Sequence, residues 1–134
     1  PLLAKRLEDD PVAGWLAVDG GQTPENDLGY LRRLAPQRLL LVDAAAMGLE
    51  PGAVRRLRAE DVAVQSLITT HTLPITYLLG ELEQMCGEVA FLGIQPGGTE
   101  FFDPVHPRVL AAVESVYAAL AEGGNFEQYP FVTL

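Results

Sequence analysis

Uninterrupted apolar runs alternate along this chain with stretches in which apolar residues recur every three or four positions. Runs without alternation are typical of strands covered on both faces, and the three-to-four spacing is typical of amphipathic helices. Strands that alternate with helices indicate a largely parallel sheet between two helical layers. We therefore expect a three-layer α/β/α fold with a mostly parallel, twisted sheet.

Three segments have the composition of buried strands, and a fourth has that of an edge strand. The run at 38–43 is rich in leucine and valine, so we expect it to be central. A weakly alternating piece at 53–57 carries arginines that can face water, which is typical of an edge strand. Buried strands are expected at 14–19, 38–43 and 89–94.

Turn and capping residues delimit the expected helices, at 1–7, 25–34, 72–86 and 107–120. Thr72 is a suitable N-cap for the third, and Gly87 ends it. Its apolar stripe is Leu73, Tyr77, Leu78, Leu82 and Met85. The stripe of the last helix is Val109, Leu110, Val113, Val116, Tyr117 and Leu120. For the tail at 125–134 no element is predicted.

Length and composition narrow the possible functions. A chain of 134 residues, 49% of them hydrophobic, is expected to fold as one domain spanning 1–134. No segment has the eighteen or so consecutive apolar residues that a membrane span needs. A net charge of −9 argues against a nucleic-acid partner, because a phosphate backbone would be repelled. One cysteine, with no leader in view, fits a protein of the reducing cytoplasm.

Polar candidates cluster at the predicted carboxyl edge of the sheet, where open α/β folds bind ligands. Asp19 and Asp43 each end a predicted strand, and Gln95 follows another. His71 directly precedes a helix, whose N-terminus disfavours an imidazolium and so keeps this side chain able to bind a divalent cation. A carboxylate with a neutral imidazole suits nickel, zinc or a similar borderline ion better than magnesium.

Both candidate metal ligands also have a purely structural interpretation. The carboxylate of Asp43 can cap the turn that follows it, and the imidazole of His71 can bond a backbone carbonyl. Protein metal sites normally use three or four ligands, so these two residues are short of at least one. The residues by themselves leave these alternatives open.

The sequence argues against several other kinds of functional site. His106 lies between two prolines at a helix start and is expected to be a surface or capping residue. Cys86 ends an apolar helix face without a basic neighbour, so we expect a core residue and not a nucleophile. The pair Gly20-Gly21 lacks the third glycine of a dinucleotide fingerprint, and no Gly-x-Ser-x-Gly or His-Glu-x-x-His motif occurs.

Four motifs occur in order along the chain: DGGQTPEND at 19–27, RLLLVDAAAMGLEPG at 38–52, TTHTLPITYLL at 69–79 and FLGIQP at 91–96. Together they resemble the [NiFe]-hydrogenase maturation endopeptidases, with the branch that processes the large subunit of hydrogenase 3 nearest. The similarity runs to about Ala119 and is less clear beyond Gly124.

The resemblance implies an endopeptidase that removes a C-terminal extension from the hydrogenase large-subunit precursor after nickel insertion. Asp43 and His71 match the family's aspartate after a central strand and its histidine before a helix. The resemblance implies that both hold the metal and serve catalysis, that nickel is recognised within the substrate, and that other divalent cations can substitute. A monomer is the family-like expectation. We expect the cleft beside the metal to be shaped by Asp19, Gly20, Gly21, Thr23 and Gln95.

One part of the family pattern is absent from the sequence. The family's first acidic ligand lies in a loop after an N-terminal strand, and Pro1 matches the position just after that loop. We therefore expect this chain to lack the first strand of the sheet and one metal ligand. The absent acid keeps an alternative open, in which the same scaffold is a non-catalytic metal-binding or docking module.

Overall fold

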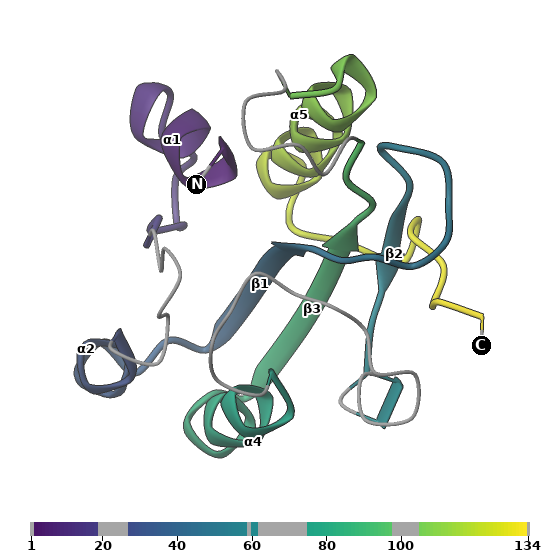
Figure 1. Cartoon of the computed structure of the whole chain (residues 1–134). Coiled ribbons are helices and arrows are strands. Elements are labelled where there is room, and N and C mark those ends of the chain that lie inside the picture. Colours follow the sequence, from purple (N-terminus) through teal and green to yellow (C-terminus); the bar gives the residue numbers. More distant parts are fainter. Residues whose placement is uncertain (1, 19–26, 59, 62–74, 98–104, 134) are drawn as a thin grey trace.

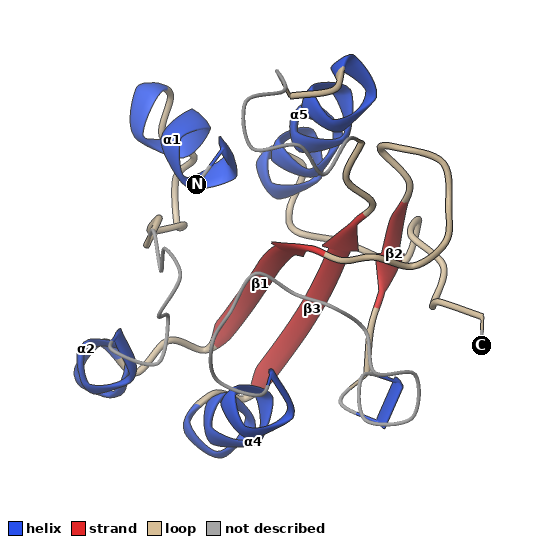
Figure 2. Ribbon diagram, in the orientation of Figure 1, coloured by secondary structure: helices blue, strands red, loops and turns tan. Residues whose placement is uncertain are grey.

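The computed structural model of the protein describes residues 2–18, 27–58, 60–61, 75–97 and 105–133. Over these residues a sheet is covered by helices on both faces (Figures 1 and 2). One face carries α1 (Leu2–Asp9) and α5 (Pro107–Ala121), and the other carries α2 (Leu28–Leu34) and α4 (Ile75–Met85). The predicted α/β fold with three layers is confirmed.

The sheet consists of β1 (Arg38–Ala44), β2 (Val54–Arg56) and β3 (Glu88–Ile94), in the spatial order β1-β3-β2. β1 pairs with β3 in parallel along its whole length, whereas the short β2 pairs with β3 antiparallel. The edge position predicted for 53–57 is confirmed, and β2 makes the described sheet mixed. The central position predicted for 38–43 is wrong in this sheet, because β3 lies between the other two strands.

The strand predicted at 14–19 is wrong over its described part, 14–18. This segment begins with a turn, in which Gly14 has a left-handed φ of 86° and Trp15 N–H donates a backbone bond of 3.1 Å. Leu16 is 62% exposed. A strand requires a neighbour for its backbone hydrogen bonds, and no described strand pairs with this segment.

Each face of the sheet has its own hydrophobic core, because successive side chains of a strand point to opposite faces. Leu92 and Ile94 belong to the core shared with α1 and α5, and Phe91 belongs to the core shared with α2 and α4. Leu82 of α4 and Val116 of α5 are almost fully buried, one on each side. Packing on both faces explains why β1 and β3 have no polar alternation.

The helices begin and end near the predicted positions, but their buried stripes differ from the prediction at two residues. Tyr77 is 54% exposed and Leu110 is 46% exposed. In α4 the buried stripe includes Leu79 instead of Tyr77, and in α5 alanines replace Leu110 on the inward face. Helical spacing alone does not say which of two overlapping stripes faces the sheet.

The tail, for which the sequence predicted no element, runs along the outer edge of β2. Arg56 N–H donates to Pro130 O over 2.8 Å, and Val132 N–H donates to Arg56 O over 3.0 Å. Phe126 and Tyr129 are buried in the core shared with α5. The tail therefore belongs to the folded structure and covers an edge that would otherwise be open.

Candidate functional site

Asp43 lies near the carboxyl end of β1, on the face covered by α2 and α4. Leu39 and Leu41 pack against the core of that face, and strand alternation places the Asp43 side chain on the same side. The residue is half-buried, and its Oδ1 accepts the N–H of Ala44 over 2.8 Å. The carboxylate therefore does make the backbone contact expected of a capping residue, at the edge where a ligand site was predicted.

Gly93 is the partner of Asp43 in the parallel ladder, and the sequence analysis did not single it out. A Cβ atom at this position would lie 2.8 Å from Leu57 Cδ1 and 3.0 Å from Ala45 Cβ. Glycine inside an apolar strand often marks such a close approach, so the signal was present in the sequence. The strand next to Asp43 is thus tightly packed on the face that carries the carboxylate.

Gln95, immediately after β3, forms hydrogen bonds with the segment that follows β1. Its Oε1 accepts the N–H of Met47 over 2.7 Å and the N–H of Leu49 over 3.3 Å. Its own N–H donates to Ala53 O over 2.9 Å. The side chain therefore holds the loop beside Asp43 in place, while its predicted contribution to a substrate cleft stays a prediction.

α4 extends from the carboxyl edge of the sheet to the amino edge. The helix ends at Met85 and β3 begins at Glu88, so the C-terminal end of α4 adjoins the amino end of β3. Its 11 residues extend about 16 Å back toward the edge that holds Asp43. His71 precedes this helix but lies outside the described residues, so its convergence with Asp43 stays a prediction.

The remaining cleft candidates are Asp19, Gly20, Gly21 and Thr23, which also lie outside the described residues. In the part of the chain that the structure describes, no group of three or more His, Cys, Asp or Glu residues is placed to hold a metal ion. Within the same part, no helix is long and apolar enough to cross a membrane. The metal-ligand assignment of Asp43 therefore depends on residues beyond the described ranges.

The structure confirms the structural roles, and not functional ones, that were predicted for His106 and Cys86. His106 is the N-cap of α5, and its Nδ1 accepts the N–H of Arg108 over 3.1 Å. Cys86 is buried just beyond α4, and burial raises the pKa of its thiol. A raised pKa lowers the thiolate fraction, which is the opposite of what a nucleophilic cysteine needs.

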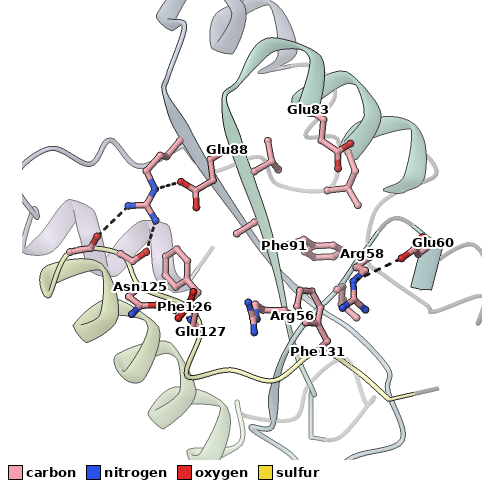
Figure 3. A pocket seen from close by; sticks show the side chains of 17 residues that line it. Arg56, Arg58, Glu60, Glu83, Glu88, Phe91, Asn125, Phe126, Glu127 and Phe131 are labelled. Atoms are coloured by element: carbon pink, nitrogen blue, oxygen red, sulfur yellow. Dashed lines mark hydrogen bonds and ion pairs between the residues drawn. The ribbon is translucent and has the colours of Figure 1, made fainter.

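A cavity of about 780 Å³ lies at the amino edge of the sheet, far from Asp43 along β1 and β3 (Figure 3). Its walls come from the first half of β3, the end of β2, α4 and the tail. Its volume does not make it the site of the predicted chemistry, because Asp43, the candidate ligand that the structure describes, lies at the other edge. The sequence analysis missed this cavity, for which the only local signal was the basic run at 55–58.

Comparison with known sequences points to one family. The family profile described as hydrogenase maturation protease matches residues 1–122. The hydrogenase 3 maturation protease of Escherichia coli K12 is 45% identical over 131 residues, which cover 96% of this chain and 84% of that protein. A putative hydrogenase maturation protease of Methanocaldococcus jannaschii is 27% identical over 106 residues, covering 78% of this chain and 62% of that protein.

Solved structures agree with the sequence comparison. A crystal structure of the hydrogenase 3 maturation protease matches with a TM-score of 0.91 and 40% identity, covering 100% of this chain and 86% of that chain. The solution structure of the endopeptidase HycI from Escherichia coli matches with a TM-score of 0.86 and 39% identity, covering 99% and 85%. The similarity in fold thus extends over the chain and accompanies substantial sequence identity.

Proposed function

The chain belongs to the hydrogenase maturation protease family, and from this premise we propose that it removes the C-terminal extension of a [NiFe]-hydrogenase large-subunit precursor after nickel insertion. Membership makes the protein a hydrolase of the protease class. The peptide bond it cleaves, the role of nickel, the cytoplasmic location and the monomeric state are parts of the proposal.

The single observation that carries the proposal is the position of Asp43. Its half-buried carboxylate lies one residue before the end of the parallel strand β1, at the edge toward which α4 leads back. His71 lies four residues before Ile75, the first residue of α4. A carboxylate and an imidazole brought to the same edge would provide two donors to one metal ion.

Nickel fits these donors because carboxylate oxygen and neutral imidazole suit borderline divalent ions, and zinc would bind to the same pair. In the proposed reaction the nickel arrives as part of the substrate, already lodged in the precursor. Asp43 and His71 would complete its coordination and so position the C-terminal extension for cleavage. A precursor without nickel would lack this contact and would not be engaged.

Gln95 supports the same site from the protein side. By accepting two N–H groups from the loop after β1, its side chain holds the backbone that directly follows Asp43. A fixed backbone limits how far the carboxylate can move before the substrate arrives, which favours binding in one orientation. We assign Gln95 as a positioning residue that acts through this loop.

The test is cleavage of nickel-loaded precursor, followed by the loss of its C-terminal peptide in mass spectrometry. Asp43→Ala and His71→Ala should each abolish cleavage while the circular dichroism spectrum stays unchanged. Asp43→Asn keeps the acceptor for Ala44 N–H but removes the charge, and it should be inactive as well. Asp10→Ala removes a carboxylate that is exposed and paired with Arg6, so this control should cleave normally.

Near-normal cleavage by either alanine variant would refute the metal-ligand assignment. Cleavage of nickel-free precursor at the same rate would refute recognition through nickel. Binding of the nickel-loaded precursor by the unsubstituted protein without any cleavage would favour the alternative, a docking module on the same scaffold.

A further inference from the structure

Sulfur occurs at three positions of this chain, and one of them lies beside the candidate site. Cys86 is the single cysteine, and Met47 and Met85 are the two methionines. Cys86 is buried beyond α4, where burial raises the pKa of its thiol. Met85 is the last residue of α4, at the amino edge of the sheet. Met47 follows the end of β1, so it lies at the carboxyl edge with Asp43.

The sulfur of Met47 is packed against the strand that neighbours Asp43. Its Sδ lies 3.5 Å from the position that a Cβ atom would occupy on Gly93, the ladder partner of Asp43. Leu57 Cδ1 and Ala45 Cβ lie 2.8 Å and 3.0 Å from the same position. Leu57 is 5% exposed and Ala45 is 0% exposed. The inner side of the sulfur therefore contacts an apolar region that excludes water.

The backbone of Met47 belongs to the loop that Gln95 holds. Met47 N–H donates to Gln95 Oε1 over 2.7 Å, and Leu49 N–H donates to the same oxygen over 3.3 Å. A single residue thus makes a backbone hydrogen bond to Gln95 and an apolar contact through its sulfur. Movement of the Met47 side chain would strain the hydrogen bonds that fix the backbone after Asp43.

The side chain of Met47 is half-buried, so solvent reaches part of it while the remainder packs against the core of the α2 and α4 face. Methionine is unbranched and has three rotatable bonds, which lets a small reagent reach the sulfur after a small change of rotamer. Oxidation of such thioethers to sulfoxides is a common reaction of methionine in proteins.

The chemistry of this oxidation is simple. A hydroperoxide transfers one oxygen atom to the thioether sulfur, so that an S–O bond forms while the O–O bond breaks. With hydrogen peroxide, water is the second product; the sulfur is oxidised and the peroxide is reduced. The sulfoxide oxygen is polar and requires a hydrogen-bond donor or water. The side chains of Leu57 and Ala45 provide no donor.

We propose that Met47 is a site of oxidation by hydroperoxides, and that its sulfoxide releases the loop after β1 and thereby impairs the site around Asp43. The polar oxygen would favour a position in water over the packed position beside Gly93, and the loop would move with it. The same reaction at Met85 would leave this loop in place, because Met85 lies at the opposite edge of the sheet. The effect on cleavage rests on the proposed function, whereas the release of the loop does not.

The experiment treats the full chain with hydrogen peroxide and locates the added oxygen by peptide mass spectrometry. Met47 should take up one oxygen atom. Amide hydrogen exchange at Met47 and Leu49 should accelerate about tenfold, as expected when a hydrogen bond of ordinary strength is lost. The protein should also lose most of its cleavage of nickel-loaded precursor. Treatment with the two methionine sulfoxide reductases, one for each epimer, should restore exchange and cleavage.

Variants of both methionines provide matched controls. Met47→Leu keeps an apolar side chain of similar volume without sulfur, so peroxide should change neither its exchange at Leu49 nor its cleavage rate, each compared with the same variant before treatment. Met85→Leu should respond to peroxide as the unsubstituted protein does. Met47→Gln introduces a polar group without oxidation and should accelerate exchange at Leu49, whereas Met85→Gln should not. Circular dichroism would show that each variant is folded.

Several results would overturn the proposal. They are oxidation of Met85 without oxidation of Met47, unchanged exchange at Leu49 in protein oxidised at Met47, and a Met47→Leu variant that remains as sensitive to peroxide as the unsubstituted protein. Accelerated exchange with undiminished cleavage would overturn the link to the site around Asp43. If the untreated protein cleaved no precursor, the proposed protease function would be wrong, and the exchange measurements would still decide whether Met47 controls the loop.

Discussion

Replacing Gly93 by alanine tests the packing beside the candidate site. The added Cβ would meet Leu57 Cδ1 at 2.8 Å and Ala45 Cβ at 3.0 Å, both far inside ordinary van der Waals contact. Leu57 is 5% exposed and Ala45 is fully buried, so neither can move into solvent. Crowding a packed core in this way costs about 1–3 kcal/mol of unfolding free energy.

The sign of this effect is informative, because alanine in a strand is otherwise favoured over glycine by about 0.5–1 kcal/mol. Gly80, inside α4, provides the matched control, since a Cβ there would have no atom within 4 Å. Gly80→Ala should raise the unfolding free energy by about 1 kcal/mol through helix propensity. The same substitution is thus expected to act in opposite directions at the two positions.

The assay is urea unfolding followed by circular dichroism. With a slope of about 2 kcal/mol per molar urea, a loss of 2 kcal/mol lowers the midpoint by about 1 M, and the gain at Gly80 raises it by about 0.5 M. Because Gly93 is the ladder partner of Asp43, precursor cleavage should also slow under conditions in which Gly93→Ala is fully folded. A midpoint for Gly93→Ala equal to or above that of the unsubstituted protein would refute the reasoning.

Two further predictions concern Gln95 and Cys86. Gln95→Leu removes the acceptor of two backbone N–H groups and should cost about 1–3 kcal/mol, whereas Gln95→Glu keeps an acceptor there. Amide exchange at Met47 and Leu49 should accelerate only in the leucine variant, and equal acceleration in both would contradict the assignment. Burial raises the pKa of the Cys86 thiol, so its alkylation should begin at higher pH in the native protein than in urea. Identical pH profiles in the two states would contradict this burial.

The strands and helices that were predicted correctly are those with a strong local pattern. The apolar run of β1 and the three-to-four spacing in α5 depend on residues only a few positions apart, so both could be recognised from the sequence. Asp43 could be placed at the end of a strand for the same reason. The segment 14–18 has an equally apolar pattern but no described strand to pair with, and it does not form a strand.

No short sequence pattern predicted the hydrogen bonds that Gln95 accepts from the loop after β1, or the contacts that Arg56 makes with the tail. Gln95 bonds the N–H of Met47, 48 residues away, and Arg56 bonds the carbonyl of Tyr129, 73 residues away. Such pairs depend on how the strands are ordered in space, which a linear pattern does not encode. The packing around Gly93 depends on the same order, because its close neighbours come from the segments after β1 and β2.

The sequence by itself determined the α/β class, the position of Asp43 after an apolar strand and, through ordered motifs, the protein family. Only the tertiary structure decided that β3 lies at the centre of the described sheet, that Gln95 holds the loop beside Asp43, and that a cavity lined by arginines and glutamates lies at the opposite edge. Local patterns arise from backbone geometry and side-chain burial over a few residues, and they are visible in any single stretch of chain. Cavities, hydrogen bonds between distant segments and the order of strands in a sheet arise from contacts between distant residues, which exist only after the chain has folded.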